Sequence, residues 1–176
     1  MKKIILVVLL TFVFLSNNVF SREFDRGTPV QNTPYEKDLK NLRIVLNGLN
    51  SDAKWKEVTD CTKKVFTYIK YKDRNTDMPS PPSLTWARKN GDCKDKSLLL
   101  AKLLNDKNII IVGGICWVND RDGHMWLEWK HEGEWYILDP TNSSKPIKLS
   151  SVGQYDYIPY YSWSKSGIYK HKVKKQ

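Results

Sequence analysis

The segment Gly91-Asp92-Cys93-Lys94-Asp95 decides how the rest of the chain is interpreted. Asp92 is a residue type that caps helix N-termini, and Asp95 stands three residues further on, where a capping box carries an acid. A helix is therefore predicted from Cys93 to about Leu104, with the cysteine in its first turn. A thiol is a nucleophile only as the thiolate, which a helix N-terminus or a nearby imidazole favours.

Two strands predicted after this helix form a hairpin. Residues 124–130 and 135–139 are rich in β-formers, and they flank a turn at Glu132-Gly133. This turn makes His124 the diagonal cross-strand neighbour of Asp139 on one face of the hairpin, within reach of a hydrogen bond.

Cys93, His124 and Asp139 together form a cysteine-based acyl-transfer site in which the aspartate orients the imidazole. Taken singly, each has an ordinary interpretation, such as a buried cysteine that acts as a small hydrophobe. The capped helix start and the matching phase of the two strands favour the joint interpretation. Gly91 leaves room for a substrate backbone.

The remaining segments predict an α+β domain. Apolar periodicity indicates helices over 36–49 and 52–71, the second capped by Asp52. A proline-rich loop covers 72–83. The run from Ile109 to Val118 predicts a strand with a bend at Gly113-Gly114, followed by a turn over 119–123. The Tyr- and Trp-rich last third is expected to add edge strands or a tail packed on the surface.

The N-terminus has the features of an export signal. Lys2 and Lys3 precede an apolar run over 4–15, and a cleavage site is expected after Ser21. An uncleaved membrane anchor is the alternative, although a span needs about 20 apolar residues. The predicted division is a signal peptide over 1–21, an N-terminal segment and helix over 22–50, a core over 51–145, and a basic, Tyr-rich segment over 146–176.

Charge and cysteine content narrow the function classes. The chain has a formal net charge of +10, which falls to +8 when the two leader lysines are removed. The lysines are scattered except in the tail over 170–175. The positive charge is therefore interpreted as a source of solubility rather than as a specific nucleic-acid surface, and an acidic envelope surface is the expected partner of the tail.

The chain has three cysteines, Cys61, Cys93 and Cys116, so at least one thiol stays unpaired. A Cys61–Cys116 disulfide would leave Cys93 as the free thiol. Finger-type zinc spacing is absent from the sequence.

Four segments together resemble the transglutaminase-like superfamily: residues 86–90, 91–100, 123–128 and 135–141. The resemblance covers about residues 55–142. It implies a papain-like, transglutaminase-core fold, with N-terminal helices and the cysteine helix packed on an antiparallel sheet that carries the histidine and the aspartate.

The resemblance implies a role for each residue of the triad. Cys93 is the nucleophile, His124 the general base and then acid, and Asp139 the orienting group. The oxyanion would be stabilised by the Cys93 N–H and by a second donor further upstream. Trp55 and Trp86 are candidates for this donor; the alternative is that each is a plain core residue.

Gly91, Asp92 and Trp126 are further substrate-binding candidates. Some periplasmic relatives carry acids on both sides of the nucleophile and bind calcium there. In this sequence Lys94 replaces one of those acids, which argues against the same calcium site, although Asp120, Asp122 and Glu128 are near enough in the sequence to form another. No metal and no cofactor is expected.

The sequence therefore predicts an exported, monomeric thiol enzyme that cleaves amide or peptide bonds in a protein or peptide substrate, in the cell envelope or outside the cell. Small size favours hydrolysis over the alternative, acyl transfer to an amine in protein cross-linking. A second alternative is a non-enzymatic envelope-binding module on the same fold. His131 and His171 have no motif around them and are expected to face solvent.

Overall fold

A computed structural model describes residues 27–30, 40–76, 78–117, 123–153 and 156–172. The predicted signal peptide and the turn over 119–123, apart from Gly123, lie outside these ranges. Within them, none of the helices combines the length and apolarity that crossing a bilayer requires.

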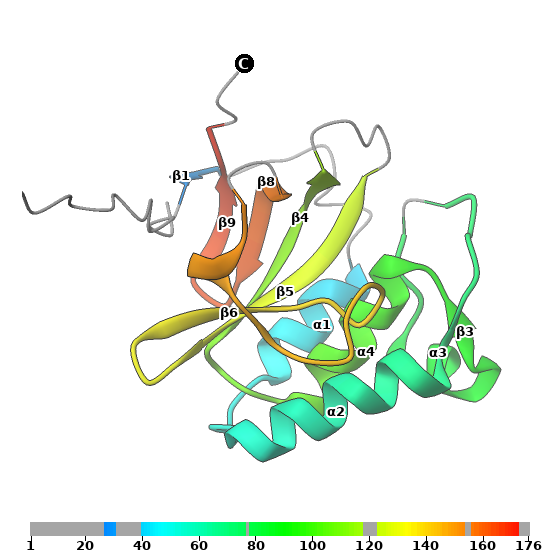
Figure 1. Cartoon of the computed structure of the whole chain (residues 1–176). Helices are drawn as coiled ribbons and strands as arrows, with labels where there is room; N and C mark the ends of the chain where they lie inside the picture. Colours follow the sequence, from blue (N-terminus) through cyan, green and yellow to red (C-terminus); the bar gives the residue numbers. More distant parts are fainter. Residues whose placement is uncertain (1–26, 31–39, 77, 118–122, 154–155, 173–176) are drawn as a thin grey trace, which may run out of the picture.

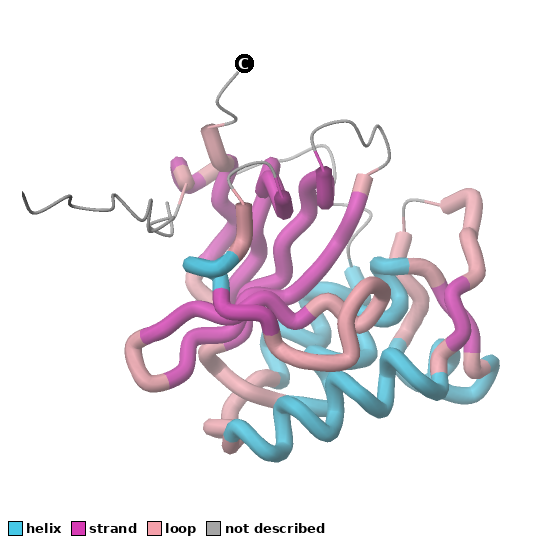
Figure 2. Tube along the Cα trace, viewed as in Figure 1, coloured by secondary structure: helices cyan, strands magenta, loops and turns pink. Residues whose placement is uncertain are grey.

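The fold is a helical layer packed on one side of an antiparallel sheet, as Figures 1 and 2 show. The helices are α1 (Lys40–Gly48), α2 (Trp55–Tyr68), α3 (Pro82–Arg88) and α4 (Cys93–Leu104). The cysteine helix α4 contacts α1, α2, α3 and the sheet strand β5, which makes it the centre of the helical layer. The α+β class with the cysteine helix on an antiparallel sheet is confirmed.

The large sheet has the strand order β1-β9-β8-β4-β5-β6-β7. Its strands are β1 (Thr28–Pro29), β4 (Ile109–Trp117), β5 (His124–His131), β6 (Glu134–Leu138), β7 (Ile147–Lys148), β8 (Asp156–Ser164) and β9 (Gly167–Lys170). All pairings in it are antiparallel. A separate two-stranded parallel sheet joins β2 (Lys70–Tyr71) to β3 (Asn90–Gly91).

Two apolar clusters hold these layers together. The larger one fills the space between helices and sheet, where Leu98 and Leu100 of α4 meet Ile111 and Leu127 of the sheet. The smaller one includes Trp126 and is closed by the short 3₁₀ helix Leu149–Ser151. Alternate residues of a strand face opposite sides of a sheet, so neighbours such as Trp126 and Leu127 belong to different clusters.

Several predicted boundaries differ from the structure. The loop predicted over 72–83 ends in a helix, α3, which has proline in its first turn, where a missing N–H costs nothing. Asp52 does not cap α2, because the N-cap residue is Lys54 and the Asp52 carboxylate instead pairs with Lys107. β8 lies between β9 and β4, so the last third contributes an interior strand as well as the edge strand β7.

Candidate active site

Cys93 is the first residue of α4, and Asp92 caps this helix as predicted. The Asp92 Oδ1 atom accepts hydrogen bonds from the backbone N–H groups of Lys94 at 3.0 Å and Asp95 at 3.1 Å. The first N–H groups of a helix have no partner within it. Because Asp92 takes the next two, the Cys93 N–H remains the candidate donor for a substrate oxyanion at the helix start.

The Asp95 carboxylate does not close a capping box. It is fully buried and accepts hydrogen bonds from the Ser80 backbone N–H at 2.6 Å and from Arg74 Nη1 at 2.8 Å. This ion pair ties the loop before α3 to the start of α4. Gly91 is required here because a Cβ atom on it would lie 2.6 Å from Cβ of Asp95. The structure therefore links Gly91 to the packing of Asp95 rather than to room for a substrate.

His124 and Asp139 meet as the hairpin register predicts. β5 and β6 pair Leu127 with Leu138, and the turn lies at Glu132-Gly133, with positive φ at both residues. His124 Nε2 lies 2.9 Å from Asp139 Oδ2. This contact commits Nε2 and leaves Nδ1 as the ring nitrogen that can exchange a proton with a nucleophile.

A β-bulge lies directly beside His124. Gly114 pairs with His124 on one side, and the register with β8 shifts between Gly113 and Gly114. A Cβ atom on Gly114 would lie 2.0 Å from the Ile158 carbonyl oxygen, so only glycine fits. Bulges of this kind re-aim side chains next to active sites. The bend predicted at Gly113-Gly114 is confirmed.

Asp139 is held by donors on both carboxylate oxygens. Oδ2 accepts hydrogen bonds from the Tyr157 hydroxyl at 2.8 Å and from Asn142 Nδ2 at 2.9 Å, in addition to His124. Oδ1 accepts from the backbone N–H of Thr141 at 2.9 Å. Sequence reasoning missed both side-chain donors. Asn142 could have been found from its place three residues after Asp139, whereas Tyr157 comes from β8 and left no local signal.

The backbone of Tyr157 has an unusual conformation. Its φ is 52°, in the left-handed region that costs a non-glycine residue of order 1–3 kcal/mol. Its ring packs edge-on against the indole of Trp126, with centroids 5.3 Å apart. Such strain persists where the surrounding structure over-determines the residue, and here the hydroxyl is fixed on the Asp139 carboxylate.

The electrostatics of the site favour a charged His124–Asp139 pair. Burial works against the charged ring of His124, but the hydrogen bond to Asp139 and further hydrogen bonds with Cys116 and Cys93 outweigh it and raise the pKa of His124 to about 12. Burial also opposes charge on Asp139, yet His124 and the other donors lower the pKa of that carboxyl. Burial, together with the Asp139 charge, raises the pKa of Tyr157, which keeps its hydroxyl a donor.

The helix start and the hairpin are joined at this point. Ser97, one turn after Cys93, donates a hydrogen bond to the backbone oxygen of Met125 at 2.9 Å. Met125 is the residue after His124, and the Cys93 thiol is within hydrogen-bonding reach of the His124 ring. An imidazolium stabilises a neighbouring thiolate. The structure thus brings together the three residues predicted for the triad.

Cys116 is a second thiol near the histidine. Its Sγ atom lies 4.0 Å from Asp139 Oδ2 and accepts a hydrogen bond from Asn142 Nδ2 at 3.5 Å. Cys116 is 1% exposed and lies within a strand, whereas Cys93 is 6% exposed at a helix start. A substrate carbonyl must reach the nucleophile, so Cys93 remains the better candidate.

Ligand atoms of Cys116, His124 and Asp139 lie within 4.8 Å of one another, a set that zinc accepts. A metal ion would have to displace hydrogen bonds that Asp139 Oδ2 already accepts.

The calcium site of the periplasmic relatives would lie beside the nucleophile. There, Lys94 Nζ lies 2.9 Å from Asp92 Oδ2, so a positive charge already pairs with that carboxylate. The expectation that no calcium ion binds there stays a prediction.

Three tryptophans are candidates for the site, and one of them, Trp126, is fully buried, so it cannot touch a substrate. Its ring stacks on His124 with centroids 6.1 Å apart and therefore supports the imidazole from behind. Trp86 belongs to α3 and carries Lys89 Nζ at 3.3 Å over its ring. Nothing in this geometry assigns Trp86 an oxyanion role.

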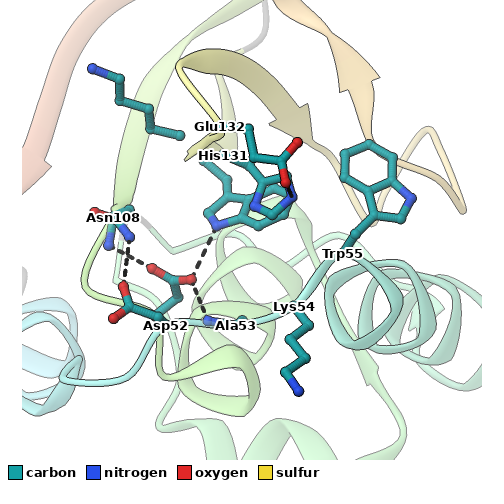
Figure 3. Close-up of a pocket in the computed structure, with 10 residues that line it drawn as sticks. Asp52, Ala53, Lys54, Trp55, Asn108, His131 and Glu132 are labelled. Carbon is teal, nitrogen blue, oxygen red and sulfur yellow. Dashed lines mark hydrogen bonds and ion pairs between the residues drawn. The ribbon is translucent and has the colours of Figure 1, made fainter.

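Trp55 lies at the other end of β5. Figure 3 shows it beside His131 in a pocket of about 500 Å³ that Asp52 and Asn108 also line. The Trp55 and His131 ring centroids are 5.8 Å apart, and His131 is the last residue of the strand that begins with His124. An eight-residue strand extends over 20 Å. Trp55 therefore cannot donate to an oxyanion at Cys93.

The structure also tests the predictions made for the other cysteines and histidines. Cys61, Cys93 and Cys116 are all thiols, so the Cys61–Cys116 disulfide considered above does not form. His171 is buried, with its ring hydrogen-bonded to the Ser162 hydroxyl at 2.8 Å, so the expectation that it faces solvent was wrong. His131 is partly covered by its stacking on Trp129.

Comparison with known proteins identifies the class to which this fold and site belong. The family model of the transglutaminase-like superfamily matches residues 43–140, more than half of the chain. The chain belongs to the transglutaminase-like superfamily. No curated protein sequence matches the chain.

Solved structures of LapG from Legionella pneumophila are similar in fold. One shares 20% sequence identity with a TM-score of 0.54, covering 72% of this chain and 74% of LapG. A calcium-bound LapG structure shares 20% identity with a TM-score of 0.51, covering 78% of this chain and 89% of LapG. At this level of identity the likeness concerns the fold alone.

Proposed function

We propose that this protein is an exported thiol hydrolase that cleaves amide or peptide bonds through Cys93, His124 and Asp139. The observation that carries the proposal is the convergence of a capped cysteine helix and a His124–Asp139 pair at 2.9 Å, joined by the Ser97–Met125 hydrogen bond. Membership of the transglutaminase-like superfamily supports it.

The proposed reaction has two halves. The Cys93 thiolate attacks the carbonyl carbon of an amide, the C–N bond breaks, and the leaving amine takes a proton from His124. Water then attacks the thioester while His124 takes its proton, and the C–S bond breaks to release the acid and restore the thiolate. Asp139 keeps the imidazole oriented in both halves, and the Cys93 N–H donates to the oxyanion.

Export of the protein rests on the basic and apolar leader at residues 1–21. A signal peptide places the mature chain outside the cytoplasm. N-terminal analysis of the mature protein checks this part: a chain that begins near Arg22 supports export, and a retained Met1 on membrane-bound protein favours the anchored alternative.

The experiment that tests the activity is digestion of a proteome-derived peptide mixture in isotopically labelled water, with an added fluorescent primary amine. Hydrolysis incorporates labelled oxygen into new C-termini, whereas acyl transfer attaches the amine to the substrate. Cys93→Ser is the inactive control, and Cys61→Ser is the matched control that keeps activity. Amine attachment alone would establish cross-linking, and the absence of both products would favour a binding module.

A further inference from the structure

Four exposed lysines lie on neighbouring segments that lead to the candidate nucleophile. They are Lys64 on α2, Lys89 after α3, and Lys70 and Lys72 on and after β2, and are called the basic strip below. Lys64 and Lys89 both place their Nζ atoms over the Trp86 ring, at 5.1 and 3.3 Å from its centroid.

Backbone contacts connect the basic strip to Cys93. The Lys70 N–H donates to the Lys89 carbonyl oxygen at 3.0 Å, and the Lys72 N–H donates to the Gly91 carbonyl oxygen at 3.1 Å. Gly91 is two residues before Cys93. Figure 1 shows the end of α2, α3 and β3 on the same side of the molecule. Through Lys72 and Gly91, the backbone of the strip therefore comes within two residues of the nucleophile.

The described acids around the basic strip do not form ion pairs with its lysines. Two carboxylates at the start of α4 have partners of their own, because Asp92 pairs with Lys94 and Asp95 with Arg74. Within the ranges that the structure describes, none of the four strip lysines forms an ion pair, and Asp73 is the exposed acid that follows the strip. Two ammonium groups over one indole repel each other, and a bound anion relieves that repulsion.

We propose that the substrate carries acidic side chains next to the scissile bond and that the basic strip holds them there; this inference rests on the proposed amide hydrolysis. Tyr71, which is 57% exposed and stands between Lys70 and Lys72, adds an aromatic surface for the same segment. An acidic protein segment fits better than an anionic polysaccharide or nucleic acid because the strip leads to a group that attacks amide carbonyls.

A positive potential at Cys93 is measurable without any substrate. Iodoacetate and iodoacetamide alkylate the same thiolate, but the first is an anion and the second is neutral. Their rate ratio therefore cancels the amount of thiolate and reports the local potential. At low ionic strength, we expect the ratio for Cys93 to exceed that of a small free thiol by about tenfold, within the range of electrostatic steering. Salt should reduce it.

The test compares two triple variants with equal change in net charge. Lys70→Glu, Lys72→Glu and Lys89→Glu together should lower the ratio about tenfold, to that of the free thiol or below. The control replaces three exposed lysines outside the strip by glutamate, and should leave the ratio close to that of wild type. These lysines are Lys54, Lys102 and Lys165. The ratio is quantified on the Cys93 peptide by mass spectrometry, and thermal melting confirms that both variants fold.

The outcomes separate this inference from the proposed function. Cys93 that resists both reagents would contradict its role as nucleophile. Cys93 that reacts with the same reagent ratio in both triple variants would overturn the acidic-substrate inference alone. In the peptide digest, bonds flanked by Asp and Glu should be cut preferentially by wild type and not by the strip variant. Equal cleavage of acidic and neutral peptides would also overturn it.

Discussion

Replacing Tyr157 by phenylalanine tests whether the hydroxyl on β8 positions the acidic member of the triad. The change removes only the donor that lies 2.8 Å from Asp139 Oδ2, and it keeps the ring against Trp126. A hydrogen bond to a charged group contributes roughly 1.5–3 kcal/mol. Asp139 keeps donors from His124, Asn142 and the backbone, so the lower end is expected, about 1.5 kcal/mol.

This free energy predicts two measurable losses. For a chain of this size, each kcal/mol lowers the melting temperature by about 2–4 °C, so Tyr157→Phe should melt about 3–6 °C lower than wild type. If the same contact is needed in the transition state, kcat should fall about tenfold with KM unchanged. Urea unfolding with an unchanged m-value separates lost stability from a changed unfolded state.

Tyr160→Phe is the matched control, because Tyr160 lies on the same strand and is 37% exposed. Its melting temperature and kcat should stay near those of wild type. Equal behaviour of the two variants would refute the assignment of Tyr157 as a positioning residue. Loss of stability with full kcat would show that the Tyr157 hydroxyl supports only the fold.

Three further predictions concern the site. His124→Ala should lower the turnover rate by roughly 10²–10⁴-fold, the usual contribution of general acid–base catalysis. His131→Ala should keep the rate within a few-fold of wild type. Equal losses in a turnover assay would show that His124 is not the catalytic base. Because Lys94 pairs with Asp92 beside the nucleophile, EGTA should leave melting temperature and thiol reactivity unchanged, and a calcium-reversible loss would reveal a site elsewhere. Asp139→Asn should reduce the free energy of unfolding most between pH 3.8 and pH 6.5, the ordinary pKa values of the two groups. The lowered pKa of Asp139 stabilises the folded state above pH 3.8. The raised pKa of His124 stabilises it fully below pH 6.5, and this contribution falls as the pH rises further. Urea titrations of wild type and variant across this range check it, and a pH-independent difference would contradict the charged pair.

The parts of the site that depend on short-range sequence patterns were predictable. The Asp92 cap and the hairpin register follow from local residue types and turn position, and together they placed Cys93, His124 and Asp139. These patterns act over a few residues, so they do not require knowledge of how distant segments pack.

The parts that depend on long-range packing were not predictable. Asp95 matched a capping box, but its carboxylate is taken by Arg74, 21 residues away, because a buried charge needs a full partner. Tyr157 joins the site through the pairing of β8 with β4, and no periodicity indicates which strands become neighbours. Trp55 has a suitable spacing in sequence, yet helix α2 carries it to the opposite end of β5.

The most direct test of the central claim is which cysteine reacts first. Folded protein is treated with a limiting amount of iodoacetamide below neutral pH, and the modified peptide is identified by mass spectrometry. Burial raises the pKa of the Cys61 thiol, and Cys116 is 1% exposed, whereas Cys93 stands at a capped helix start within reach of a charged His124. The account predicts that Cys93 is labelled ahead of both; prior labelling of Cys61 or Cys116 in folded protein would contradict it.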